Sequence, residues 1–119
     1  MKLRELNNYI DINIDEALEE RFMDSEELYV RFLKKLAAEN ELPVVEAFVR
    51  EENWPEALRI AHNLKGVCAS LGLVKLTAQL VELVKLLRSD AFTRAEVEKQ
   101  LAAMRPEWDK TLECIVALV

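Results

Sequence analysis

Residues 54–72 read WPEALRIAHNLKGVCASLG, and their apolar side chains recur at the spacing of one helix face. The triplet Asn53-Trp54-Pro55 marks a helix start, and Gly72 is a typical C-terminal stop. We therefore predict a helix that begins at this triplet and runs to Leu71. Its inward stripe should consist of Ala57, Ile60, Ala61, Leu64, Val67, Cys68 and Leu71.

Helix signals recur through the rest of the chain. Capping residues stand three positions before a glutamate at 13–16, 24–27 and 93–96, and Pro43 suits the first turn of another helix. The further helices that we predict cover about 15–23, 24–40, 42–52, 74–88 and 93 onward. Pro106 falls inside the last of them and should kink or break it near Arg105.

Short connections between amphipathic helices favour an all-α fold. The chain has only two glycines and three prolines in 119 residues, which agrees with a largely helical structure. We predict an antiparallel four-helix bundle core with short extra N-terminal helices. Residues 1–119 should form one domain, because no linker, repeat or low-complexity stretch divides them.

Composition also argues against two classes of function, nucleic-acid binding and membrane insertion. The net charge of −6 argues against a nucleic-acid-binding surface. No apolar run approaches the ~20 residues of a membrane helix, and residues 1–8 lack a secretory hydrophobic region. We expect a cytoplasmic protein with no membrane segment.

The two cysteines, Cys68 and Cys114, suit buried apolar positions of a protein in a reducing compartment. A disulfide between them is the less favoured alternative. A single histidine and the lack of a Cys-x-x-Cys motif argue against a zinc site.

The only histidine, His62, lies about 200° around the predicted helix from Leu64. It therefore falls on the outer face, where Lys65 and Gly66 follow it about one turn later. A glycine inside a helix costs about 1 kcal/mol relative to alanine. Bare backbone beside the only imidazole suggests that a partner approaches the ring closely.

Two interpretations of this outer face remain open. In the simpler one, His62 is an exposed side chain with a nearby lysine, and Gly66 is tolerated by chance. In the functional one, His62 is a nucleophile and Lys65 sits beside a phosphoryl group carried on the ring. Gly66 then removes the side chain that would block a bulky phosphate donor.

The stretch 61–73 resembles the histidine-containing phosphotransfer (HPt) domain family. The matched positions are His62, Leu64, Lys65 and Gly66 in the family's H-x-L-K-G core, Gly72 as its second glycine, and Leu76 in the following helix. The acidic-Asn-Trp helix start at 52–54 and the segment 15–29 are similar too. The resemblance spans the first ninety residues, whereas the last helix matches only in being amphipathic.

One position departs from the family pattern. Twelve residues after the second glycine the family usually carries Glu or Gln, which can hydrogen-bond the histidine ring, and this chain has Val84. A valine there would widen an apolar docking patch. A hairpin turning near Gly72 brings residues around 82 level with position 62, so the docking surface that we predict around His62 consists of Leu58, Arg59, Ala69, Val81 and Val84.

The resemblance implies a phosphorelay intermediate. A response-regulator receiver would pass an aspartyl phosphoryl group to His62, and a second receiver aspartate would accept it. The chain has no Gly-rich phosphate loop, so we expect a phosphocarrier without its own ATP site rather than an enzyme. It would need no cofactor of its own, with Mg²⁺ on the partner receiver. The implied partners are receiver domains, a hybrid sensor histidine kinase, or both, and we expect a monomer.

The sequence also allows other functional interpretations, which belong to different classes of protein. The main alternative is a helical interaction module that docks a signalling partner without being phosphorylated. A fragment of a chemotaxis kinase or of a hybrid sensor kinase also remains open. A di-iron bundle would need Glu-x-x-His pairs, and Arg59 stands three residues before His62.

Overall fold

A computed structural model describes residues 1–119 as a bundle of helices, which confirms the all-α prediction. Its elements are a short 3₁₀ helix η1 (Leu3–Asn8), α1 (Ile14–Arg21), α2 (Glu26–Glu39), α3 (Leu42–Arg50), α4 (Trp54–Ser70), α5 (Val74–Arg88) and α6 (Arg94–Val116). The α5 boundaries are those predicted from the sequence. Helix η1 was not predicted.

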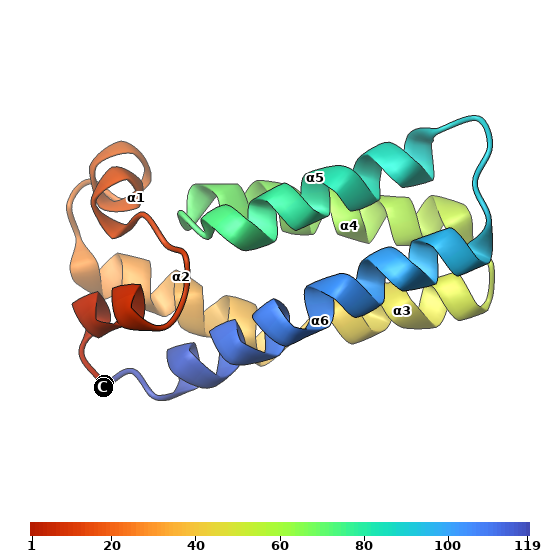
Figure 1. Cartoon of the computed structure of the whole chain (residues 1–119). Coiled ribbons are helices and arrows are strands. Elements are labelled where there is room, and N and C mark those ends of the chain that lie inside the picture. Colours follow the sequence, from red (N-terminus) through yellow and green to blue (C-terminus); the bar gives the residue numbers. More distant parts are fainter.

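Four rods of helix run side by side along the molecule (Figure 1). Helices α2 and α3 lie end to end and form one rod, and α4, α5 and α6 form the other three. Helices η1 and α1 cover one end of the bundle, next to α2. The molecule measures 42 × 24 × 20 Å along its principal axes.

The break between α2 and α3 is built around Asn40. This residue caps α2 in the left-handed conformation, with φ 42°, which asparagine adopts more readily than most residues. Its side-chain oxygen accepts a hydrogen bond of 2.9 Å from the indole N–H of Trp108 on α6. The contact gives the buried indole N–H an acceptor and fixes the α2–α3 junction against the adjacent helix α6.

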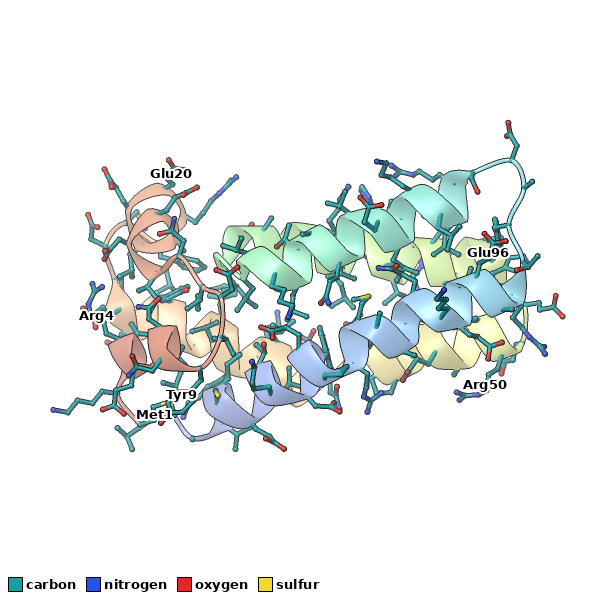
Figure 2. All side chains as sticks on the ribbon, viewed as in Figure 1. Met1, Arg4, Tyr9, Glu20, Arg50 and Glu96 are labelled. Atoms are coloured by element: carbon teal, nitrogen blue, oxygen red, sulfur yellow. The ribbon has the colours of Figure 1, made fainter.

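One apolar core runs through the bundle, from Leu3 at one end of the chain to Leu118 at the other. Charged side chains such as Arg4, Glu20 and Arg50 point away from it (Figure 2). The helices begin at side-chain caps: Asn13, Ser25, Asn53 and Thr93 each accept a backbone N–H of the first turn. The caps at 13, 53 and 93 fall where the sequence signals them, and the α2 cap falls one residue later, at Ser25.

The prediction of a break at Pro106 is wrong, because α6 runs without interruption through this residue. Proline removes one N–H, which leaves the carbonyl of Ala102 without its usual partner. Both residues are exposed, so water can satisfy that carbonyl. Packing of the apolar face on both sides then keeps the helix continuous.

The C-terminus of α4 closes with two reverse hydrogen bonds. Gly72 takes a left-handed conformation, φ 74°, and its N–H donates to the carbonyl of Ala69 at 3.1 Å. The N–H of Leu73 donates to the carbonyl of Cys68 at 3.0 Å. This is the Schellman arrangement, in which glycine avoids the steric penalty that other residues pay.

Two distant segments hold this end of α4 in place. The N–H of Asn13 donates to the carbonyl of Gly72 at 2.8 Å, so close that a Cβ on Gly72 would lie 2.5 Å from the Asn13 oxygen. The buried hydroxyl of Tyr29 on α2 donates to the carbonyl of Leu71 at 2.6 Å. Because α4 is fastened here, the residues along its middle are presented on a rigid support.

Both cysteines are free thiols with little exposure, as the preferred reading of the sequence predicted. Burial raises the pKa of Cys68 to about 12. The structure groups no three His, Cys, Asp or Glu side chains in a way that could hold a metal ion. None of its helices is long and apolar enough to cross a membrane.

Candidate functional site

His62 is the middle residue of α4, and its side chain is exposed, as predicted. Its neighbours Ala61 and Leu64 are buried in the core, so they fix which way the helix faces. The imidazole therefore stands on the outer surface of a helix whose opposite side is anchored.

Gly66, one turn after His62, is exposed and surrounded by open space. A Cβ added to it would meet no atom within 4 Å, and its φ is not positive. Neither packing nor backbone conformation therefore requires glycine at this position. Its effect is to keep the surface beside the His62 ring free of side-chain atoms.

The two cations that flank His62 on α4 differ in how they are partnered. Arg59 is held by Glu56, with an Nη2 to Oε2 distance of 2.8 Å and Nε contacts to both carboxylate oxygens at 3.2 Å. This pairing lowers the pKa of Glu56 and raises the pKa of Arg59. Lys65 takes part in no ion pair or side-chain hydrogen bond of the structure, so its ammonium is available to an incoming anion.

A residue that sequence reasoning missed also contacts the ring. Nη2 of Arg88, the last residue of α5, lies 3.3 Å from Nδ1 of His62. Arg88 lies one turn beyond Val84, the position where Gln or Glu was expected from the resemblance. A search one turn further along the same helix face would have found this polar group.

The predicted docking surface is wrong at Val84, which is only 3 % exposed. Helix α5 packs against both α4 and α6, so its buried arc is wide enough to include Val84 beside Leu80 and Leu83. Leu58 is half-buried and packs against the core. Arg59, Ala69 and Val81 are exposed as predicted, but with Val84 buried the five predicted residues do not form one outer surface.

The prediction that Val67 faces inward is also wrong, because it is 43 % exposed. It lies near Phe32 of α2 and Val44 of α3, which are also large exposed apolar residues. We call these three residues the apolar strip. It lies on the α2–α3 side of His62, opposite to the α5 side that the sequence favoured.

Two hollows follow this strip. One of about 490 Å³ includes all three strip residues, and one of about 610 Å³ includes Phe32, Val67 and also His62 and Gly66. Arg21, at the end of α1, lines the second hollow and pairs with no carboxylate. An apolar depression therefore leads to the imidazole and has the unpaired Arg21 in its lining, in a protein whose net charge is −6.

The site thus combines one nucleophile, an open approach and uncompensated positive charge. A protein-family model described as "Hpt domain" matches residues 16–116 of the 119-residue chain, from α1 to α6. No curated protein and no solved structure matches the chain.

Proposed function

The chain belongs to the Hpt domain family, and from this premise we propose that it is a phosphorelay intermediate in which His62 carries the phosphoryl group. Hpt domains take part in histidine phosphotransfer in two-component phosphorelays, and they are phosphocarrier modules rather than catalytic enzymes. The observation that supports His62 as the carrier is its exposure beside the open surface at Gly66. No other histidine is present to play this part.

The proposed step is a reversible displacement at phosphorus. Nε2 of His62 attacks the phosphorus of a receiver aspartyl phosphate, and the bond from phosphorus to the carboxylate oxygen breaks. The electron pair of that bond returns to the aspartate, and the new bond joins phosphorus to Nε2. The reverse reaction delivers the group to the aspartate of a second receiver.

This reaction needs mainly in-line positioning and charge neutralisation, which one nucleophile and nearby cations can provide. Lys65 would neutralise part of the charge on the transferring group. The receiver would supply Mg²⁺ and the remaining catalytic groups, so we propose no cofactor and no ATP site in this chain.

We propose that the receiver docks along the apolar strip, Phe32, Val44 and Val67. The strip runs into the hollow that contains His62, so a partner seated there meets the ring at one end. The unpaired Arg21 and Lys65 would attract an acidic, phosphorylated active site. Hpt domains interact with receivers and kinases, so either kind of partner could present such a site.

Residues 1–119 share one apolar core, which supports treating them as one functional unit. The two free cysteines support a location in the cytoplasm, where thiols stay reduced. We propose that the unit acts as a monomer.

The deciding experiment mixes untagged protein with a panel of phosphorylated receiver domains from the same genome and follows acid-labile phosphate by mass spectrometry. We expect rapid labelling of the wild type by at least one receiver, and none in His62→Gln. Circular dichroism should show that the variant stays folded, because His62 is exposed. A protein that binds receivers but never acquires phosphate would instead be a docking module, and label retained in His62→Gln would place the phosphate elsewhere.

A further inference from the structure

The smaller of the two hollows, about 490 Å³, has in its lining an acidic residue, Glu41, that forms no ion pair. The lining also contains Lys35 and Glu39, which pair with each other at 3.8 Å between Nζ and Oε1. Arg59, the remaining charged residue of the lining, pairs with Glu56 at 2.8 Å. The carboxylate of Glu41 is therefore the charge that this hollow leaves open to a partner.

The place of Glu41 in its own helix leaves this carboxylate without a hydrogen-bond partner. Glu41 precedes α3, and a negative charge there favours the N-terminal end of the helix. Its side chain forms no capping hydrogen bond, unlike the caps that begin α1, α2, α4 and α6. After the larger effect of Glu56, Glu41 also helps to raise the pKa of Arg59, so it lies near that guanidinium but outside ion-pair distance.

The larger hollow, about 610 Å³, has a charge of the opposite sign. Arg21 is the one permanently charged residue in its lining, and it pairs with no carboxylate. Phe32 and Val67 of the apolar strip line both hollows, so the two hollows adjoin. Arg21 ends α1 at one end of the bundle, whereas Glu41 lies at the junction of α2 and α3 (Figure 1). The apolar strip therefore lies between a free cation on its α1 side and a free carboxylate on its α3 side.

We propose that Glu41 is a specificity-determining residue, which selects receivers that carry a lysine or arginine where they meet the α2–α3 junction. The inference rests on the proposed function, because it takes the partner to be a receiver whose acidic active site closes on His62. It adds a requirement on the chemistry of that partner. The docking face of a matched receiver is acidic at the His62 end and basic at the Glu41 end.

The two charges give the docking surface a direction. Hydrophobic contact has no direction along the strip, because it depends on the apolar area removed from water. A receiver turned end for end would cover much the same area, yet its phosphorylated aspartate would lie away from His62. The productive orientation pairs a receiver base with Glu41 and receiver acids with Arg21. The reversed orientation brings like charges together at both ends, which is strongly unfavourable at an interface.

Closure of a receiver over the hollow should make the requirement stricter. Glu41 is half-buried in the free protein, and docking removes more of the water around it. Removal of water strengthens an ion pair that forms, and it leaves an unpaired carboxylate without its hydration. A receiver that lacks the base is therefore disfavoured. Glu41 selects by rejection of unmatched partners as well as by attraction of matched ones.

The test measures, by calorimetric titration, the dissociation constant of each receiver in the panel for the wild type and for charge variants. Glu41→Gln removes the charge with little change of shape, and Glu41→Arg reverses it. Glu113→Arg is the matched control, because Glu113 is an exposed acid on α6 that forms no ion pair and lines neither hollow. Thermal melting reports the stability of each variant, and Glu41→Gln decides the test if Glu41→Arg is destabilised.

We expect the receiver that binds most tightly to bind Glu41→Gln about three- to tenfold more weakly, and Glu41→Arg more weakly still. Both losses should shrink at high salt, whereas Glu113→Arg should change the affinity by less than about twofold. Lysines and arginines on the docking face of that receiver are then changed to glutamate one at a time. One such change should weaken binding to the wild type and restore binding to Glu41→Arg. The rescuing position should lie away from the phosphorylated aspartate of the receiver.

Equal affinities of the wild type and Glu41→Gln for every receiver would overturn the inference. Equal losses in Glu41→Arg and Glu113→Arg would also overturn it, because they would point to net charge. A loss in Glu41→Arg that no change in the receiver rescues would give Glu41 a structural role instead. A receiver whose binding depends on Glu41 but that never labels His62 would refute the proposed phosphoryl transfer alone, whereas binding by no receiver would refute both.

Discussion

At the scale of single residues, Lys65 is the cation beside His62 on α4 that no carboxylate neutralises. We predict that Lys65→Ala keeps the fold and slows transfer from a receiver, because a positive charge is lost beside the developing phosphoryl charge. The barrier should rise by about 1–3 kcal/mol, the scale of a charge-assisted hydrogen bond. Single-turnover kinetics measure the effect, and Arg59→Ala is the control because Arg59 is already paired with Glu56. Transfer at the wild-type rate would show that Lys65 is only a solvated surface residue.

A substitution at Gly66 should affect phosphoryl transfer without lowering the stability of the fold. We predict that Gly66→Gln leaves the melting temperature unchanged or raises it, with a gain of up to about 1 kcal/mol from helix propensity. The open space around Gly66 excludes a packing clash. Transfer should nevertheless fall severely, because the new side chain stands where a receiver has to close on His62.

The other glycine provides the control for that prediction. Gly72→Ala should lower stability by about 1–3 kcal/mol, because Gly72 is left-handed and its Cβ would collide with the Asn13 carbonyl. Melting temperature and transfer rate are measured on the same preparation of each variant. A Gly66→Gln protein that transfers normally would make Gly66 a chance occupant of an exposed turn.

Some residues of the candidate site could be predicted from sequence and others could not. His62, Lys65 and Gly66 share one helix, so the helical period alone places them on one face. Arg88 and Phe32 reach the same region from α5 and α2. Their positions depend on how helices pack and where long side chains turn, and a single-helix pattern carries neither kind of information.

At the scale of elements, the errors at Val67 and Val84 have one cause. A helical wheel gives the direction of a buried stripe but not its width, which depends on how many neighbours cover the helix. Helix α5 has neighbours on two sides, so Val84 is buried. Val67 lies at the edge of the α4 stripe, beside the hollows at the α2–α3 junction, and stays exposed.

Docking on the α2–α3 side of His62 and docking on its α5 side predict different effects of mutation. We expect Val67→Ser to weaken receiver binding and transfer about tenfold or more, because the apolar strip loses contact area in the middle of the interface. Val81→Ser, an equal change at an exposed valine on α5, should have little effect. Titration with a receiver, followed by chemical-shift changes, measures both. A stronger effect at Val81 would return the docking surface to the α5 side predicted from sequence.

At the scale of the whole molecule, composition and periodicity predicted the helical class, and capping residues predicted most helix starts. The end-to-end arrangement of α2 and α3 and the hydrogen bond from the Asn13 N–H to the Gly72 carbonyl were not predicted. The hydrogen bond joins segments far apart in the chain, and the end-to-end placement depends on packing against α4 and α6, so local propensity reports neither feature. The continuity of α6 through Pro106 was not predicted either, because packing on both sides of the proline outweighs a local helix-breaking signal.

The buried core also predicts how the whole fold responds to alkali. Burial raises the pKa of Tyr29 well above its usual value and the pKa of Cys68 to about 12. Both groups are neutral when protonated, so the folded chain holds these protons more tightly than the unfolded chain does. Above about pH 9 for the thiol and about pH 10 for the phenol, the unfolded chain loses protons that the folded chain keeps. The free energy of unfolding should then fall with rising pH, by about 1.4 kcal/mol per pH unit for each such group.

Urea denaturation between about pH 8 and about pH 11.5 measures this slope, which should be absent below the range where the unfolded thiol titrates. We predict that Cys68→Ala, although less stable at neutral pH because it leaves a small cavity, loses stability more gently as the pH rises. Tyr29→Phe should flatten the slope above about pH 10 while costing the hydrogen bond to Leu71 at every pH. Tyr9→Phe changes an exposed phenol and is the matched control. A slope in Cys68→Ala as steep as that of the wild type would mean that the thiol ionises without unfolding the bundle.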